Sequence, residues 1–515
     1  MPVIAKRGLT EKVKRSKVAP QFTIALTKLS IRHWQLCRGI LIKNKKMQRT
    51  YIKDLKNKIG EEVSISCWVD VRRDHGKLIF VDLRDMTGKV QAVALPNHKE
   101  AVAVASTIRS EWVIEVSGKI NPRPEKLINK NEENGSIEME IFSIKVLNEA
   151  VTPALNVSGD GKDIDEEVRL KYRYLDLRRP RMQKNIRNRH KVMLLTRNIL
   201  EKEGFCEIET PNLTIATAEG SKNFIVPSRL EKGKFYALPQ APQQYKQLLM
   251  ASGFEKYFQF ARCFRDEDTR GDRQPEFTQM DLEMSFVTEE DVMNVNEKAL
   301  IEVVQKIYPH KKIQQIPFPR ITYKEAMEKY GSDKPDIRTD KNDPDLLAFA
   351  WIVDFPMFEK GDDGQWTFTH NPFSGTKPES YNDLMNKTNI ENIMAAQYDI
   401  TLNGSEVGGG SIRNHRPEAL RKVLEIMGFS DEKIEKEYGH MLKAFETGTP
   451  PHGGIAWGLD RLIMILENEP NIREVIAFAK TGEGKDLMMN APSEVSVEQL
   501  KELHIKIDLP PKKNK

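Results

Sequence analysis

The chain has 515 residues, of which 39% are hydrophobic and 30% are charged, and this balance predicts a globular protein of two or three domains. It contains no run of about 20 apolar residues, the length that a membrane-spanning helix needs. The four cysteines form neither a CxxC pair nor a Cys/His cluster, which argues against a disulfide scaffold and against a zinc site.

The net charge of +5 is unevenly distributed along the chain. Residues 1–46 contain twelve of the 80 Lys and Arg residues but only one of the 75 acids, Glu11, so the remaining chain holds more acids than bases. This basic extension is either an organelle transit peptide or the product of an upstream start codon, with Met47 as the true first residue. Its low serine content favours the second interpretation. Any nucleic-acid site in the rest of the chain must be a local patch.

Residues 47–150 are predicted to be all-β. The segments with strand patterns are 63–71, 77–85, 89–95, 111–120 and 138–147. The short segment 86–88, which ends in glycine, is a hairpin signal between the second and third strands. Five short strands in about 100 residues suit a small closed barrel such as the OB-fold.

The first predicted hairpin of this barrel combines cations with an aromatic ring, because Arg73 and His75 precede Phe80. On a barrel surface such residues bind single-stranded RNA, since cations contact phosphates and the ring stacks on an unpaired base. The alternative is a solvated hairpin with Phe80 in the barrel core. The sequence leaves both interpretations open.

Residues 151–181 are rich in charge and are expected to form a linker, followed by a second domain over residues 182–508 and a basic tail over residues 509–515. Within the second domain, helical patterns cover 185–203, 288–306 and 416–446, and strand patterns lie in 222–286, 348–370 and 398–413. This order predicts an α+β domain built on an antiparallel sheet.

Three segments of the second domain combine charged residues with glycines or a sheet face. Residues 264–283 hold many charges on a strand–loop–strand, and charges on a covered sheet face need a ligand or a partner. Residues 407–413 contain three consecutive glycines close to Asp399 and Glu406, two carboxylates suited to a hard cation such as Mg²⁺. Arg461 is expected in the first turn of a helix, where a cation opposes the helix dipole and is better placed beside a phosphate.

These segments resemble the three signature motifs of the class II aminoacyl-tRNA synthetases. A helix ending in Glu209-Thr210-Pro211 resembles motif 1, residues 264–267 (FRDE) resemble motif 2, and residues 458–461 (GLDR) resemble motif 3. Within that class, residues 48–508 resemble the bacterial aspartyl-tRNA synthetases almost throughout. The long matches are 172–180 (YRYLDLRRP), 265–281 (RDEDTRGDRQPEFTQMD) and 406–413 (EVGGGSIR).

The resemblance implies a cytoplasmic homodimer that activates L-aspartate with ATP and transfers it to the 3′ end of tRNA-Asp, with Mg²⁺ as cofactor. The implied catalytic residues are Arg265, Glu267 and Arg461. The implied ATP contacts are these three residues together with Asp266, Gln274, Glu406, Gly458, Leu459 and Asp460. The implied aspartate contacts are Glu219, Gln243, Lys246, Arg265, Asp281, His370 and Arg413. Mg²⁺ ligands are expected at Asp399 and Glu406, and anticodon contacts at Arg73, His75, Phe80 and Gln91.

The residue types agree with these roles. Glu219 and Asp281 suit the substrate ammonium, whereas Lys246 and Arg413 suit its side-chain carboxylate. Two buried cations favour a carboxylate over an amide, so aspartate is expected rather than asparagine. The rival hypothesis is a non-catalytic paralogue that binds RNA or dimerises, but the essential Arg and acid residues of the motifs are all present.

The chain departs from the family in three places. Ala241 stands where relatives often have Ser, and Asn371 stands where many have a second His. The large extra domain usual in the bacterial enzymes is absent between residues 330–338 and 346–359.

Two residues of the barrel bear on the specificity for tRNA. His75 occupies a position where a His accompanies relaxed enzymes, which charge tRNA-Asn as well as tRNA-Asp, while strict enzymes tend to carry Leu. The two tRNAs differ at the third anticodon base, C against U, and an imidazole both donates and accepts hydrogen bonds, so it tolerates either pyrimidine. Lys126 favours strict specificity instead, because relaxed relatives often have Gly at that position. Charging both tRNAs would require a tRNA-dependent amidotransferase in the same cell.

Overall fold

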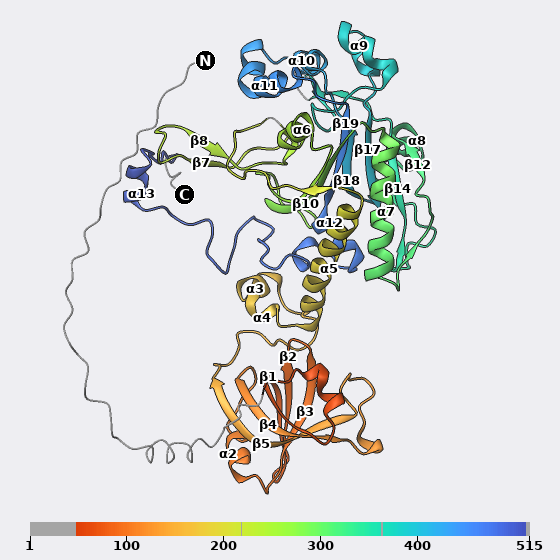
Figure 1. Cartoon of the computed structure of the whole chain (residues 1–515). Coiled ribbons are helices and arrows are strands. Elements are labelled where there is room, and N and C mark those ends of the chain that lie inside the picture. Colours follow the sequence, from red (N-terminus) through yellow and green to blue (C-terminus); the bar gives the residue numbers. More distant parts are fainter. Residues whose placement is uncertain (1–47, 218, 362–363, 511–515) are drawn as a thin grey trace, which may run out of the picture. The chain divides into compact units, whose positions relative to one another are not determined.

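The computed structural model describes residues 48–217, 219–361 and 364–510, so the predictions for residues 1–46 and for 511–515 of the tail lie outside the described residues. The chain divides into two compact units, Met1–Pro153 and Ala154–Lys515, and each unit has its own hydrophobic core (Figure 1). Across the described part of the chain, no helix combines the length and the apolar character that crossing a membrane requires.

The first unit is a closed five-stranded barrel, which confirms the predicted OB-fold architecture. Around the barrel the strands are β1 (Glu62–Asp74), β2 (Ile79–Asp85), β3 (Gly88–Ala94), β5 (Ile137–Asn148) and β4 (Val113–Pro122). Neighbours are antiparallel except β3 and β5. Shorter elements are η1 (Ile52–Lys58), α2 (Lys99–Ala105) and η2 (Glu125–Leu127). Because successive side chains alternate across a strand, β2 buries Ile79, Val81 and Leu83 and leaves Phe80 half-buried on the outer face. Phe80 is therefore not a residue of the barrel core.

The second unit is built on an eight-stranded sheet. In spatial order its strands are β12 (Arg320–Thr322), β14 (Phe349–Val353), β17 (Gln397–Leu402), β18 (Ser405–Ile412), β19 (His452–Gly458), β10 (Glu276–Ser285), β9 (Lys256–Phe264) and β6 (Cys206–Glu207). The edge strands β12 and β6 run parallel to their neighbours, and all other pairs are antiparallel. The predicted α+β domain on a mainly antiparallel sheet is confirmed.

Three helices pack against this sheet and enclose the largest core: α5 (Pro180–Lys202), α7 (Glu289–Ile307) and α12 (Leu459–Leu466). The other helices are α3 (Glu166–Lys171), α4 (Arg173–Asp176), α6 (Gln243–Ala251), α8 (Tyr323–Tyr330), α9 (Tyr381–Asn386), α10 (Pro417–Ile426), α11 (Asp431–Phe445), α13 (Val497–Glu502) and the short η3 (Pro378–Ser380), η4 (Ile390–Asn392) and η5 (Ile472–Glu474). Small two-stranded sheets pair β7 (Ile225–Pro227) with β8 (Phe235–Ala237), β11 (Lys312–Ile313) with β13 (Leu346–Leu347), and β15 (Phe358–Lys360) with β16 (Trp366–Phe368).

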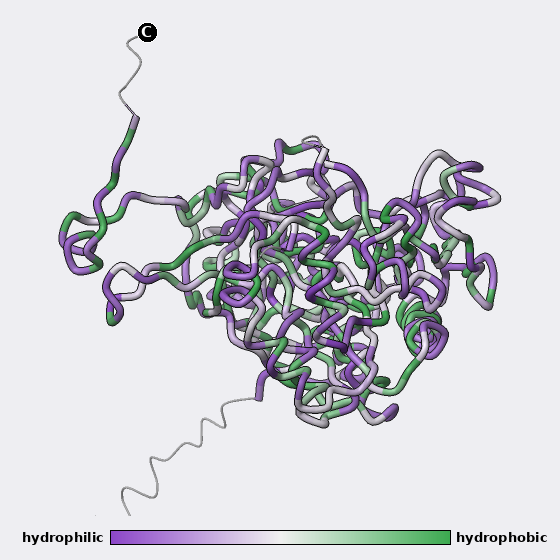
Figure 2. Tube along the Cα trace, turned by 90° about the horizontal axis from the view of Figure 1, so that it is seen from above, coloured by the Kyte–Doolittle hydropathy of each residue, from purple (hydrophilic) through white to green (hydrophobic). Residues whose placement is uncertain are grey.

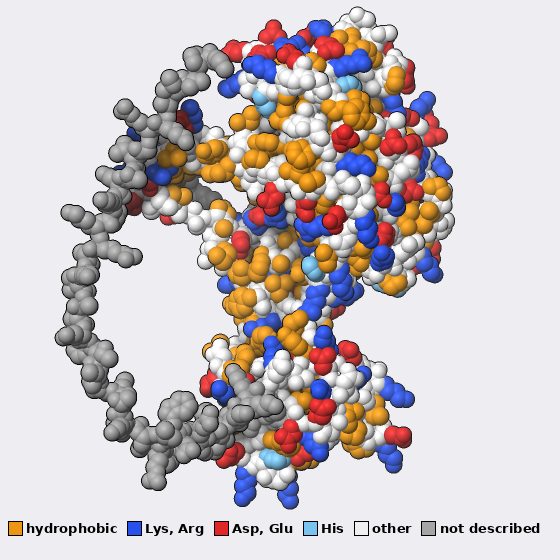
Figure 3. Space-filling model, in the orientation of Figure 1, with side chains coloured by type: hydrophobic (Ala, Val, Ile, Leu, Met, Phe, Trp, Pro, Cys, Tyr) orange, Lys and Arg blue, Asp and Glu red, His pale blue; other side chains and the backbone are white. Residues whose placement is uncertain are grey.

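Hydrophobic and hydrophilic residues alternate at short intervals along most of the trace (Figure 2), as amphipathic strands and helices require. On the face drawn in Figure 3, acidic and basic side chains are interspersed over the described residues. This pattern agrees with the nearly balanced charge of the chain after residue 46.

The segment expected to be a linker is largely folded into the second unit. It contains α3 and α4, and residues from Ala154 onward cluster with that unit. Asp176 is fully buried, and its two oxygens bind Arg179 Nε and an Arg173 guanidinium nitrogen, each at 2.8 Å. The charges of this segment therefore form internal ion pairs.

The first motif differs in detail from its prediction. Helix α5 ends at Lys202, and Glu209 lies beyond the short strand β6, outside any helix. The prediction of a helix ending at Glu209-Thr210-Pro211 was therefore wrong. The apolar helical pattern stops where Gly204 takes a left-handed conformation with φ of 86°.

Candidate active site

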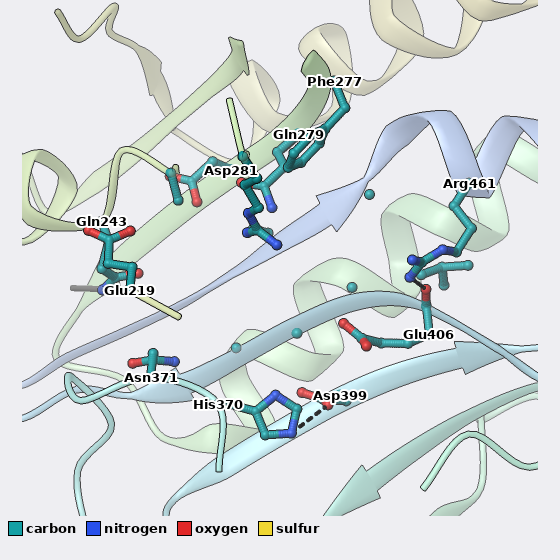
Figure 4. Close-up of a pocket in the computed structure, with 18 of the residues that line it drawn as sticks. Glu219, Gln243, Phe277, Gln279, Asp281, His370, Asn371, Asp399, Glu406 and Arg461 are labelled. Carbon is teal, nitrogen blue, oxygen red and sulfur yellow. Dashed lines mark hydrogen bonds and ion pairs between the residues drawn. The ribbon is translucent and has the colours of Figure 1, made fainter. Parts of the chain in front are cut away.

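A cavity of about 300 Å³ opens over strands β10, β17, β18 and β19 of the second unit. The predicted residues that line it are Glu219, Gln243, Lys246, Arg265, Glu267, Gln274, Asp281, His370, Asp399, Glu406, Arg413, Gly458, Asp460 and Arg461. Figure 4 shows Glu219 and Gln243 at one end of this cavity and Glu406 and Arg461 at the other. Asp266 and Leu459, also predicted, do not line it, and Leu459 belongs to the hydrophobic core.

The end near Gln243 has a floor of buried, paired charges. Lys246 Nζ lies 2.8 Å from Asp281 Oδ1 and 3.3 Å from Glu283 Oε2. Arg413 donates to both oxygens of Glu283, from Nε at 3.0 Å and from a terminal nitrogen at 3.2 Å. The two cations predicted to bind a substrate carboxylate thus already have carboxylate partners. Glu283 was missing from the predicted site, although its spacing of two from Asp281 on one strand places both on the same face.

Two carboxylates at this end are suited to accept hydrogen bonds from a cation. Asp281 Oδ2 is buried and has no hydrogen-bond partner among the described residues, and burial raises the pKa of Asp281. Although Glu219 keeps partial access to solvent, burial raises the pKa of its carboxyl to about 7. An ammonium group between these acids would satisfy the open acceptor and favour the ionised form of both.

Two arginines of the cavity have unused donors. Arg265 lies over the ring of Phe277, 5.1 Å from its centroid, and its Nε is buried without a hydrogen-bond partner in the described chain. Arg461 Nε is likewise unpartnered, while its terminal nitrogens bind Asp272 Oδ2 at 3.0 Å and the carbonyl oxygen of Glu406. Two guanidinium groups with free donors suit phosphate oxygens.

Two of the predicted ATP contacts have other partners. Asp460 borders the cavity, but one carboxylate oxygen accepts from Thr278 N at 3.0 Å and the other pairs with Arg189. These bonds hold the start of α12 against β10 and α5, so the geometry gives the Asp460 carboxylate a structural role. Gln274 is buried, and its Oε1 accepts from Lys480 N at 2.8 Å.

Asp399 and Glu406 bring two hard oxygen ligands to one place. A Cβ atom on Gly409 would lie 2.8 Å from Asp399 Oδ1 and 3.6 Å from Glu406 Oε1, so glycine leaves room for both carboxylates. Burial, opposed by His370 and reinforced by Glu406, raises the pKa of Asp399 to about 7, and His370 Nε2 lies 3.5 Å from Asp399 Oδ2. The described residues contain no cluster of three or more ligating side chains. Two carboxylates completed by substrate phosphates nevertheless fit Mg²⁺, which commonly binds in that way.

Two of the three departures from the family, Ala241 and Asn371, lie at the cavity. Ala241 lines it without offering a hydrogen-bond donor, and Asn371 lines it with its Oδ1 accepting from Phe373 N at 3.0 Å.

The four residues predicted to bind the anticodon lie together on the barrel. Arg73 binds both oxygens of Asp82, at 2.7 and 2.8 Å, and Gln91 Oε1 at 3.3 Å. His75 packs edge-on against Phe80, with ring centroids 5.6 Å apart. Asp82 was not predicted, and the pairing of Asp82 with Gln91 across β2 and β3 was the signal that could have found it.

Comparisons with known proteins agree with this geometry. The sequence profile described as tRNA synthetases class II (D, K and N) matches residues 165–482, and that of the OB-fold nucleic acid binding domain matches residues 63–147. The aspartate–tRNA(Asp/Asn) ligase of Natranaerobius thermophilus is 39% identical over 89% of this chain and 100% of the relative. The aspartate–tRNA ligase of Macrococcus caseolyticus is 38% identical over 88% of this chain and 97% of the relative.

The fold also matches a solved structure. Asparaginyl-tRNA synthetase from Pyrococcus horikoshii with asparaginyl-adenylate gives a TM-score of 0.69 at 21% identity, covering 84% of this chain and 98% of that chain. The alignment with the Natranaerobius relative runs over 587 positions, more than the 515 residues of this chain. That relative therefore contains residues without a counterpart here.

Proposed function

This chain belongs to the aspartate–tRNA ligases, within the class II tRNA synthetases, and on that premise we propose how its cavity carries out the reaction. An enzyme of this family activates L-aspartate with ATP and transfers the aspartyl group to the 3′ end of tRNA. The reaction is assigned to this cavity because charged groups of different kinds line different parts of it. Paired cations and open carboxylates lie at the end near Gln243, Arg461 lies at the other end, and a second arginine with a spare donor, Arg265, also lines the cavity.

Aspartate is proposed to bind at the end near Gln243. Glu219 and Asp281 accept hydrogen bonds from its ammonium group, because Asp281 Oδ2 has no other partner among the described residues. Lys246 and Arg413 donate to its side-chain carboxylate, with Gln243 and His370 beside them. This arrangement leaves the α-carboxylate directed toward the phosphate end.

ATP is proposed to bind at the end near Arg461. Arg265 contacts the α-phosphate and the attacking carboxylate, and Arg461 contacts the far phosphates, so both stabilise negative charge in the transition state. Glu267 and Gln274 hold the nucleotide. The reaction needs no protein nucleophile, since positioning and electrostatics suffice for attack of a carboxylate on ATP.

Asp399 and Glu406 are proposed to hold Mg²⁺. When bound, the ion neutralises phosphate charge and orients the phosphate oxygens of ATP. The space that Gly409 leaves between the two carboxylates supports this proposal.

Isotope exchange between ATP and pyrophosphate tests these assignments. With the full chain and each amino acid in turn, exchange is expected with aspartate alone and only in the presence of Mg²⁺. Equal exchange with asparagine, or exchange that survives removal of divalent metal by a chelator, would contradict the proposal.

We also propose that the enzyme charges both tRNA-Asp and tRNA-Asn. His75 is exposed on the barrel beside Phe80, and the Natranaerobius relative is named for both tRNAs. The alternative is strict specificity for tRNA-Asp, which the name of the Macrococcus relative and Lys126 favour. Purified transcripts of both tRNAs, charged with labelled aspartate, decide between them. A kcat/KM for tRNA-Asn about a thousandfold below that for tRNA-Asp would refute relaxed specificity.

Three further assignments follow from the family and remain proposals. The enzyme acts in the cytoplasm as a homodimer, and a tRNA-dependent amidotransferase converts aspartyl-tRNA-Asn to asparaginyl-tRNA. Light scattering coupled to size exclusion measures the oligomeric state directly.

A further inference from the structure

Glu283 is a buried anion beneath the proposed aspartate site, and it binds both cations of that site. Its side chain has no exposed surface, and it accepts two hydrogen bonds from Arg413 and pairs with Lys246. Although burial raises it, the pKa of Glu283 lies below its usual value because Arg413 and Lys246 stabilise the charged form. Glu283 is therefore an ionised carboxylate at the base of the site.

Glu283 determines which donors of the two cations remain available to a ligand. Arg413 also donates to Ser411 Oγ at 2.8 Å, so three of its five N–H groups are used within the protein. Two of the three N–H groups of Lys246 face Asp281 and Glu283. Among the described residues nothing else binds these two side chains, so two donors on Arg413 and one on Lys246 are left over.

The donors left on Arg413 and Lys246 distinguish a carboxylate from an amide. A carboxylate accepts at both of its oxygens, whereas an amide must turn its NH₂ group toward a donor. Leaving such a buried polar group unpaired makes a site reject a close analogue strongly. The choice of a carboxylate over an amide thus depends on Arg413 and Lys246 being held so that those donors stay available to the ligand.

The sheet leaves space for the Glu283 side chain because the residue opposite it is a glycine. Glu283 pairs with Gly454 across β10 and β19, and a Cβ atom on Gly454 would lie 2.1 Å from Glu283 Oε2. A side chain at position 454 would therefore displace the carboxylate. Together, Glu283 and Asp281 balance the charges of Lys246 and Arg413, so net positive charge cannot by itself explain a preference for a carboxylate.

We propose that Glu283 is a positioning residue that sets the choice of aspartate over asparagine by orienting Arg413 and Lys246. This inference rests on the proposed assignment of the aspartate site. It assigns selectivity to a residue that does not itself touch the substrate.

The test compares Glu283→Gln with the unmodified enzyme in ATP–pyrophosphate exchange. Breaking a buried, hydrogen-bonded ion pair is costly, so the KM for aspartate is expected to rise about 100-fold. The KM for ATP should stay within about twofold, since Arg265 and Arg461 are untouched. The ratio of kcat/KM for aspartate to that for asparagine should fall at least about tenfold.

Two further variants separate positioning from a general structural effect. Glu297→Gln removes another buried carboxylate, which pairs with Arg320 in the same unit away from the cavity, and should leave both KM values unchanged. Ser411→Ala frees one Arg413 donor without changing any charge, and should raise the KM for aspartate several-fold even if Glu283→Gln fails to fold.

The possible outcomes are distinct. An unmodified enzyme without aspartate-dependent exchange would overturn the proposed function. A folded Glu283→Gln enzyme with an unchanged KM for aspartate, or with equal rises in the KM for aspartate and ATP, would overturn only this inference. If Glu283→Gln does not fold, an unchanged KM for aspartate in Ser411→Ala would overturn it.

Discussion

Arg265 is the side chain on which the proposed chemistry depends most directly. Its guanidinium is positioned over Phe277, and its Nε has no partner among the described residues. Arg265→Ala is expected to lower the rate of ATP–pyrophosphate exchange about 10³-fold, because an arginine at a reacting phosphoryl group is worth about that much.

A neighbouring arginine supplies the control for that measurement. Arg262 lies on β9, three residues before Arg265, but pairs with Glu276 outside the cavity. Arg262→Ala should therefore exchange at nearly the normal rate. Equal losses in the two variants would show that the fold, and not the phosphate contact, had been damaged.

Glu219 predicts how aspartate binding depends on pH. Its pKa of about 7 means that the carboxyl is largely protonated at about pH 6 and ionised at about pH 8. Only the ionised form attracts the substrate ammonium, so the KM for aspartate should fall roughly tenfold between these pH values. In Glu219→Gln the part of the pH dependence of this KM that comes from Glu219 should disappear. Any part that comes from Asp281 should remain in both proteins. An identical pH profile in the two enzymes would remove Glu219 from the site.

At the scale of elements, strand β2 separates the core of the barrel from its outer face. Phe80 is half-buried between two inward residues, Ile79 and Val81. Phe80→Ala should lower tRNA charging at least about tenfold, because stacking of a base on a ring is worth about 1–3 kcal/mol. ATP–pyrophosphate exchange and the free energy of unfolding should change little.

Phe142 offers a matched aromatic for comparison. It is also partly exposed on the barrel, on β5, where its ring centroid lies 4.8 Å from that of His98 with the two rings tilted by 43°. Phe142→Ala should charge tRNA normally. If both variants lose charging to the same extent, the effect comes from the barrel as a whole and Phe80 has no special role.

At the scale of the whole molecule, the two units have separate cores. The core of the first unit begins at Ile52, and the first described bridge joins Arg49 to Ser64. A chain that starts at Met47 is therefore expected to keep exchange and charging within about twofold of the full chain, since it keeps every residue of that core. Side-by-side charging of tRNA-Asp measures this, and charging by the full chain alone would show that residues 1–46 are functional.

The sequence alone determined the elements and the chemistry carried by short motifs. Alternation along a strand and glycine at the end of an element are local properties, so the barrel strands and the position of Arg461 in the first turn of α12 could be predicted from neighbouring residues. Residue types such as Arg265 in the FRDE motif identified the reaction for the same reason, since each motif lies within a few residues of chain.

Only the tertiary structure decided which charges pair with one another. Glu283 meets Arg413 across 130 positions of sequence, and Arg189 meets Asp460 across 271, through the packing of distant elements. The sequence therefore named Arg413 and Asp460, but it did not predict their partners, Glu283 and Arg189. An ion pair forms where sheet register and helix packing bring two side chains within about 4 Å, and no local pattern encodes that distance.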